Sequence, residues 1–186
     1  KSDLTDVDFT NSDLDGVNFR LAHISNTNFS NLDLRNTHGL GGASGNFQGA
    51  NLSGLTLVPG FYYSDFTNAN LSKIIGHKFI LNHNDFTNAN LSGAYLSGGY
   101  YNSMGKKICE NLYGSQEINK FTHNDFTNAN LSGATLDCYT MRGNIFSNTN
   151  FENITLIGKI KQYPWFEDDA AFDLRQNQQM ILVPSE

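Results

Sequence analysis

Large apolar residues return at every fifth position over two long stretches of this chain. The first series is Leu4, Phe9, Leu14, Phe19, Ile24, Phe29 and Leu34, and the second is Phe126, Leu131, Leu136, Met141, Phe146, Phe151 and Leu156. Successive side chains of an extended strand point to opposite faces, so an odd spacing would send alternate large residues outward. The chain must therefore turn once in every pentad. Because a period of five matches neither a helix nor a coiled coil, an all-β structure is predicted.

A repeated octapeptide gives the length of one coil. Asp-Phe-Thr-Asn-Ala-Asn-Leu-Ser occupies residues 65–72, 85–92 and 125–132. The offsets are multiples of 20 residues, so four pentads complete one coil and the copies lie above one another. Adjacent strands are about 4.8 Å apart, and stacked coils would place Asn68 beside Asn88 and Asn70 beside Asn90. The sequence therefore predicts a four-sided solenoid of about seven coils.

The pentads also carry a recurrent local motif. Ala-Asn-Leu-Ser begins at residues 50, 69, 89 and 129. This A(D/N)Lxx pattern resembles the pentapeptide-repeat family and extends over most of residues 1–160. The resemblance implies a right-handed quadrilateral parallel β-helix. We expect this domain to span residues 1–161, with an inserted loop at 102–120, and a separate segment to follow at 162–186. The chain begins inside a repeat, so we also expect further sequence upstream.

Threading four pentads to a coil assigns the large residues to sides. Side one is predicted to hold Leu4, Ile24, Phe47, Phe66, Phe86, Phe126 and Phe146. Side two is predicted to hold Phe9, Phe29, Leu52, Leu71, Leu91, Leu131 and Phe151. Side three is predicted to hold Leu14, Leu34, Leu57, Leu96, Leu136 and Leu156, with Gly76 as an exception. The irregular segments then gather at side four: 39–45 with three extra residues, 59–63 with one fewer, 77–83, and about 20 extra residues between 100 and 123.

Side four is consequently the predicted partner-binding face. Aromatic side chains are enriched at protein interfaces, and long loops on regular scaffolds tend to carry function. The candidate contact residues are Phe61, Tyr62, Tyr63, Tyr100, Tyr101, Lys106, Lys107 and Tyr113. In the alternative interpretation, the same aromatic residues seal a distorted side of the core.

The segment 162–186 differs from the repeats. It carries a short apolar stripe at Phe166, Ala170, Phe172 and Leu174, and a further apolar run at 180–183. A solenoid needs its open end covered, so a short C-terminal helical cap is predicted. A dimer formed through this tail is the alternative to the favoured monomer.

Charge and composition exclude several classes of function. The formal net charge of −6 argues against direct nucleic-acid binding, which needs clustered Lys and Arg. No apolar run approaches the roughly 20 residues of a membrane span. The five histidines lack metal-ligand spacing, and Cys109 and Cys138 are expected to be reduced thiols. No cofactor, metal site or catalytic residue is predicted, so the chain is expected not to be an enzyme.

Three hypotheses for function remain open at the level of the sequence. The first is a non-catalytic interaction module in a secreted bacterial effector, made in the bacterial cytoplasm and acting on a host protein. The second is the recruiting domain of a larger enzyme, since the plan resembles the β-helix of SopA-type HECT-like ubiquitin ligases. The third is DNA mimicry by a topoisomerase-binding protein, as in gyrase-protecting members of the family. Outside an effector, the expected location is the cytoplasm.

Overall fold

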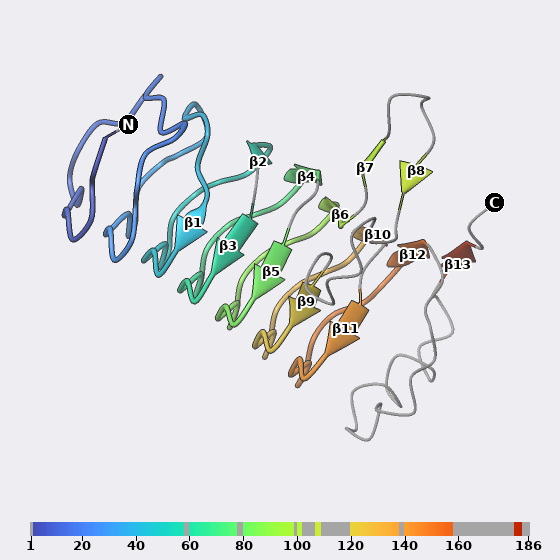
Figure 1. Cartoon of the computed structure of the whole chain (residues 1–186). Helices are drawn as coiled ribbons and strands as arrows, with labels where there is room; N and C mark the ends of the chain where they lie inside the picture. The colour runs from blue at the N-terminus through green and yellow to red at the C-terminus, as the bar shows by residue number, and fades with distance from the viewer. Residues whose placement is uncertain are drawn as a thin grey trace.

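The described chain forms a stack of four-sided coils. The computed structural model describes residues 2–57, 60–77, 80–98, 100–101, 107–108, 120–137, 140–157 and 181–183. Figure 1 shows the coils following one another from the N-terminal end of the stack to the last strand. Within the described ranges the secondary structure consists of short strands, bridges and turns, without a helix. No helix in this part of the chain has the length and hydropathy that a membrane crossing requires.

Sides three and four are parallel sheets that run along the stack. Side four contains, in spatial order, β1 (Gly42–Ala43), β3 (Gly60–Tyr62), β5 (Ile80–Asn82), β9 (Lys120–Thr122) and β11 (Thr140–Arg142). Side three contains, in spatial order, β13 (Ile181–Val183), β12 (Thr155–Ile157), β10 (Thr135–Asp137), β6 (Tyr95–Ser97), β4 (Ile75–His77) and β2 (Thr56–Leu57). A separate antiparallel pair joins β7 (Tyr100–Tyr101) to β8 (Lys107–Ile108).

Sides one and two are held together by single parallel bridges between coils. On side one the bridges run from Asp65 to Asp85 and from Asp85 to Asp125. On side two they run from Asn70 to Asn90 and on to Asn130. The four predicted sides are thus confirmed, whereas the handedness and the number of coils stay predictions.

A column of phenylalanine rings fills side one of the core. Its members are Phe9, Phe29, Phe47, Phe66, Phe86, Phe126 and Phe146. Neighbouring ring centroids lie 4.8 to 5.5 Å apart, and adjacent planes differ by no more than 21°. Phe66, Phe86 and Phe126 are fully buried. Since each ring packs on the next coil, the core is a continuous stack.

The predicted threading of the first two coils is wrong by one side. Phe29 stacks on Phe47 at 5.1 Å, so it belongs to side one. Phe47 follows Phe29 by 18 residues, two fewer than a full coil, so the segment at 39–45 shortens the coil. Ile24 lies instead against Gly42 of β1, on side four. The observed register stacks Phe29 on Phe47. It also brings Leu34 to side two, because the N–H of Leu34 donates to the carbonyl of Asn51, the residue before Leu52.

The corners between sides use left-handed backbone conformations. Asn68, Asn88 and Asn128 have φ of 59°, 57° and 56° at the corner between sides one and two. Their amides form an exposed ladder, with Asn88 donating to Asn68 at 3.2 Å and Asn128 to Asn88 at 3.1 Å. Asn tolerates this conformation better than most residues, which explains its recurrence at this position.

Lys73 occupies the next corner, where Gly54, Gly93 and Gly133 stand in other coils. Its φ is 58°, and its side chain is exposed. A side chain in this region costs about 1–2 kcal/mol, while Gly enters it freely but loses more entropy on folding. We therefore expect Lys73→Gly to raise the free energy of unfolding by about 0.5–1 kcal/mol in urea denaturation. Lys73→Ala retains Cβ and is the control. Equal stabilisation by both variants would contradict the claim that a Cβ at this corner strains the backbone.

The C-terminal end of the described chain is a strand rather than a helix. Residues 181–183 form β13, which pairs in parallel with β12 and matches Leu182 to Leu156. The apolar run that the sequence assigns to a cap therefore continues side three. The predicted helical stripe at 166–174 lies outside the described residues.

Candidate interaction surface

Side four is more regular than its sequence suggests. Phe61, Leu81 and Phe121 are in register across β3, β5 and β9, and all three side chains are buried. Phe61 packs edge-on against Phe47 at 5.2 Å and against Phe66 at 4.9 Å. Its predicted place among the partner-contacting residues is therefore corrected, because it is the inward-facing residue of its strand. For Phe61, the sealing interpretation is the right one.

The outer border of side four carries a stack of exposed rings. Tyr63, His83 and His123 follow β3, β5 and β9, at the corner that leads to side one. The ring centroids of Tyr63 and His83 lie 4.8 Å apart, and those of His83 and His123 lie 4.7 Å apart. All three side chains are exposed, Tyr63 by 62%, whereas Tyr62 is half-buried. We call Tyr63, His83 and His123 the ring ladder.

A buried polar ladder holds this corner in place. The amide of Asn84 donates to the Phe61 carbonyl at 3.1 Å, and that of Asn124 donates to the Leu81 carbonyl at 3.1 Å. The backbone N–H of Asn84 donates to Oδ1 of Asn124 at 3.0 Å, and the Asn124 N–H donates to Asn144 at 3.0 Å. Among the described residues, no buried side-chain polar atom lacks a partner. Each coil is thus bonded to the next beneath the ring ladder.

Three carboxylates follow the rings in the sequence and lie on side one. Asp65, Asp85 and Asp125 each lie two residues after a ring and are in register through parallel bridges. One oxygen of each accepts the backbone N–H two residues on, at 2.8 Å. None of the three takes part in an ion pair within the described ranges. We call Asp65, Asp85 and Asp125 the carboxylate ladder.

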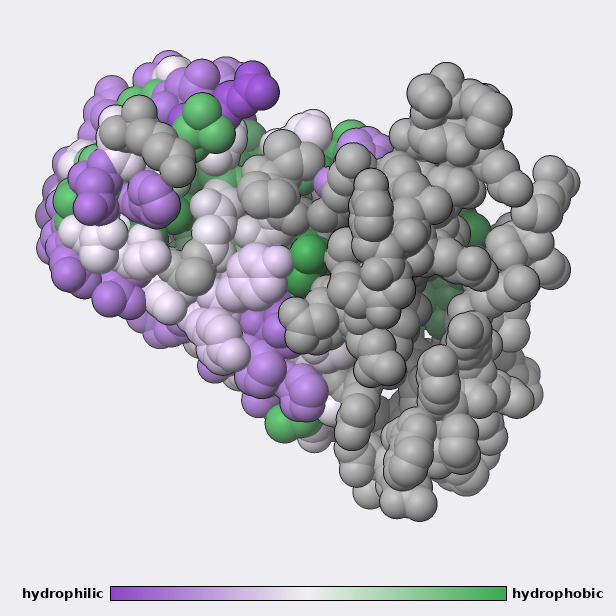
Figure 2. Space-filling view, in the orientation of Figure 1, coloured by the Kyte–Doolittle hydropathy of each residue, from purple (hydrophilic) through white to green (hydrophobic). Residues whose placement is uncertain are grey.

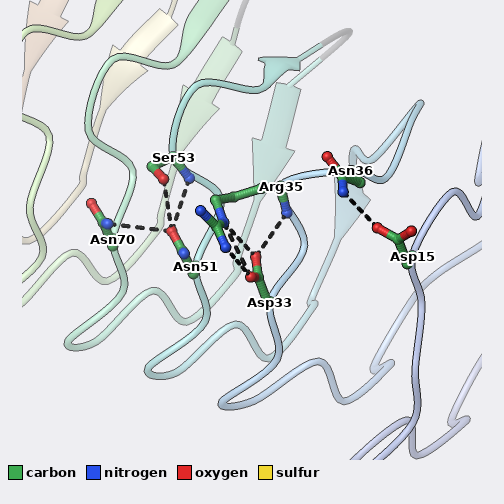
Figure 3. A network of polar contacts seen from close by, with 7 residues as sticks. All are labelled: Asp15, Asp33, Arg35, Asn36, Asn51, Ser53 and Asn70. Atoms are coloured by element: carbon green, nitrogen blue, oxygen red, sulfur yellow. Dashed lines mark hydrogen bonds and ion pairs between the residues drawn. The ribbon is translucent and has the colours of Figure 1, made fainter.

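Side two provides a contrast at Asp33, whose carboxylate is paired with a cation. Figure 3 shows Arg35 against Asp33, with Nε of Arg35 at 2.9 Å from Oδ1 and Nη2 at 2.5 Å from Oδ2. The hydrogen bond from Arg35 lowers the pKa of the Asp33 carboxyl. In the next coils Asn51 and Asn70 replace the acid and bond to each other at 3.2 Å. From Asp33 to Asn130, the aligned positions of side two therefore hold no unpaired carboxylate, whereas those of side one hold Asp65, Asp85 and Asp125.

The long insertion leaves the coil between sides three and four. Strand β5 pairs directly with β9, and β6 pairs directly with β10, so the coils close up beneath the insertion. Figure 1 shows β7 and β8 standing away from the stack. Tyr100 faces Ile108 and Tyr101 faces Lys107 in this hairpin, of which only the backbone is described. Two predicted contact residues, Lys106 and Tyr113, lie outside the described residues.

A buried carboxylate lies on side three close to this insertion. Asp137 has no exposed surface, and its Oδ2 accepts hydrogen bonds from the Tyr95 hydroxyl at 2.9 Å and the Ser97 hydroxyl at 3.1 Å. The backbone carbonyl of Asp137 also accepts the N–H of Gly98, where the insertion begins. This arrangement ties the start of the insertion to the following coil.

Comparison with known proteins agrees with this architecture. Residues 2–38, 61–98 and 125–158, more than half of the chain, match the model for pentapeptide repeats, in eight copies. The chain belongs to the pentapeptide-repeat family. No curated protein matches it in sequence.

Two solved pentapeptide-repeat structures resemble this chain. A trypsin-treated variant of QnrB1, a plasmid-mediated fluoroquinolone resistance protein, is 17% identical, with 98% of this chain and 90% of that chain covered and a TM-score of 0.40. HetL, involved in heterocyst differentiation regulation in the cyanobacterium Nostoc, is also 17% identical, with 82% and 86% covered and a TM-score of 0.33.

The sequence of this pentapeptide-repeat protein carries a signal for the ring, buried polar and carboxylate ladders, although the pentad pattern alone does not predict them. Residues 83–93 and 123–133 are identical, and this identity includes the His-Asn-Asp triplets that build all three ladders. The histidines lack metal-binding spacings, but His83 and His123 are separated by 40 residues, twice the coil length of 20, and this spacing brings their rings together. In the described ranges no group of three or more His, Cys, Asp or Glu residues could hold a metal ion.

Figure 2 shows that the visible early coils of this pentapeptide-repeat protein are mostly hydrophilic, with scattered hydrophobic patches. The large hydrophobic side chains that are exposed in the described chain are Leu21, Tyr63, Ile75 and Ile145. Tyr63 is the one that continues into a stack of further rings. The ring ladder lies at the border of side four with side one, and the hairpin lies at its border with side three. These two borders are the distinctive surfaces of side four.

Proposed function

We propose that this chain is a non-catalytic protein-interaction module whose inserted hairpin contacts the partner. The observation that carries the proposal is the direct pairing of β5 with β9 and of β6 with β10. The coils need nothing from the insertion to stack, and long loops retained on a regular scaffold usually serve a function. In the finer form of the proposal, the module belongs to a secreted bacterial effector and holds a host protein, either alone or as the recruiting domain of a ubiquitin ligase.

A gyrase-protecting DNA mimic is the second candidate, and the carboxylate ladder favours it. A mimic needs a continuous acidic stripe, and Asp65, Asp85 and Asp125 form one. The stripe ends at Ile145, however, and carries one charge per coil, about 4.8 Å, compared with one per about 1.7 Å of duplex DNA. The module hypothesis is therefore preferred.

Removing residues 100–119 tests the role of the hairpin. The deletion leaves residues 98 and 99 between β6 and β9, the same two-residue link that joins β4 to β5. Because loop-closure entropy changes slowly with length, we expect the free energy of unfolding to stay within about 2 kcal/mol of the parent in urea. A larger loss would show that the fold depends on the insertion.

The same deletion variant then decides between the two functions. We expect affinity capture from eukaryotic lysate to recover a specific protein with the intact chain and not with the deletion variant. Purified DNA gyrase is offered to both forms of the chain in a parallel capture experiment. If gyrase binds both forms equally while no host protein depends on the hairpin, DNA mimicry replaces the module hypothesis.

A further inference from the structure

We infer that the ring ladder and the adjoining carboxylates form a docking surface for an arginine-bearing segment of a protein partner. This surface is separate from the hairpin, so the inference goes beyond the proposed function and does not depend on it. Tyr63 and Asp65 are its central pair.

Backbone conformation shows that bulky side chains are kept here at a cost. Tyr63, His83 and His123 have φ of 52°, 57° and 55°, in the region that favours glycine. Gly143, with φ of 64°, occupies the same corner one coil further on. The fold therefore accepts glycine at this position, and three rings remain despite a penalty of about 1–2 kcal/mol each. The backbone at this corner therefore does not require the three rings.

One ring face in the ladder is available to a ligand. His83 is stacked between Tyr63 and His123, and a Cβ on Gly143 would lie 2.7 Å from the ring of His123. On the opposite side, the neighbour of Tyr63 in the column is Ser44, whose N–H bonds to the Tyr62 carbonyl. Serine is too small to cover a phenol ring, and Tyr63 is 62% exposed. The open face is therefore that of Tyr63.

The charge beside this ring specifies the ligand. Asp65 follows Tyr63 by two residues. Its carboxylate accepts the N–H of Thr67 and has no cationic partner within the described ranges. Asp85 and Asp125 continue the negative stripe. A guanidinium group can stack on an aromatic face and also pair with a carboxylate through two N–H groups, whereas an ammonium group lacks the planar fork. Charge complementarity and the open ring thus favour arginine over lysine.

The surface is also rigid before any partner arrives. Ser64, Asn84 and Asn124 lie between the ring and the carboxylate of their coils and are buried. The N–H of Ser64 donates to Asn84 at 3.0 Å, which continues the bonding seen from Asn84 to Asn124. Because these residues are already ordered, binding of a partner segment costs little conformational entropy in this chain.

Two peptides of equal length and charge test the inference, one with arginine and one with lysine at the basic positions. We expect fluorescence anisotropy at about 0.15 M salt to show about 3- to 10-fold tighter binding of the arginine peptide to the intact chain. Tyr63→Ala should remove this preference, and Tyr63→Phe should retain it. Asp65→Asn, which keeps the acceptor for the N–H of Thr67, should weaken the binding of both peptides.

The control for charge is Asp13→Asn. Asp13 is exposed on side two and makes the same kind of contact, accepting the N–H of Asp15 at 3.0 Å. Equal affinity for the two peptides, or an equal loss from Asp13→Asn and Asp65→Asn, would overturn the inference. The variant without residues 100–119 should bind the arginine peptide as the intact chain does, so failure of the hairpin proposal would leave this result unchanged.

Discussion

Phe86→Ala is expected to lower the free energy of unfolding by about 3–5 kcal/mol, the usual loss for removing a buried phenylalanine. Phe86 is fully buried, and its ring lies 5.0 Å from that of Phe66 and 4.8 Å from that of Phe126. The substitution therefore removes a ring contact on both sides as well as apolar burial. Each aromatic pair adds about 0.5–1.5 kcal/mol beyond burial, which places the effect in the upper half of the range.

The position of Phe86 in the stack gives this prediction a second part. Repeats of a solenoid contact only their neighbours, so a weakened interior coil separates the units on either side. We expect urea unfolding of Phe86→Ala, followed by circular dichroism, to broaden or divide into two transitions. Phe9→Ala is the matched control, since Phe9 lies at the N-terminal end of the column and is only partly buried. An equal loss from the two variants would contradict a continuous core.

Asn124→Ala is expected to cost about 3–4 kcal/mol, because it breaks the buried ladder at its middle. The Leu81 carbonyl loses its donor, and the N–H and amide of Asn84 lose their acceptor, at 3.0 and 3.1 Å. Each buried polar group left unpaired costs about 1–3 kcal/mol. Thermal and urea unfolding would measure the loss.

An exposed asparagine of the same coil provides the comparison. Asn128 has φ of 56° and donates to Asn88 at 3.1 Å in the exposed ladder. Its Oδ1 also accepts from the amide of Asn148 at 3.3 Å. Asn128→Gly keeps the backbone conformation and removes two exposed hydrogen bonds that water can replace, so we expect a change below about 0.5 kcal/mol. If Asn128→Gly were as destabilising as Asn124→Ala, burial would not be what makes the inner ladder important.

The repeat period predicted most of this fold, because side-chain alternation leaves few solutions for a five-residue spacing. The columns through Phe66, Phe86 and Phe126 and the stacking of the octapeptides are confirmed. For the first two coils, the pentad count predicts a position that is one side away from the observed one. Counting pentads cannot tell whether the segment at 39–45 adds three residues or removes two, and the choice is made by contacts between coils, where Phe29 stacks on Phe47.

The interaction surface was only partly predictable for a related reason. Side four lacks the A(D/N)Lxx motif, so nothing local shows that Phe61 faces inward and Tyr63 outward. Their places follow from register with Leu81 and His83 one coil later. The stack of His83 on His123 spans 40 residues and depends on the insertion being excluded from the coil. Such contacts are properties of the assembled stack rather than of any pentad.

The most direct test of side four as the interaction face is hydrogen–deuterium exchange of the chain alone and with its captured protein partner. The hairpin and the ring ladder border this side, so we predict that partner binding slows exchange in peptides covering 100–108 and 60–65. Peptides covering the exposed asparagine ladder at 87–92 and 127–132, on the corner between sides one and two, should exchange at unchanged rates. Protection confined to that asparagine corner would contradict the account.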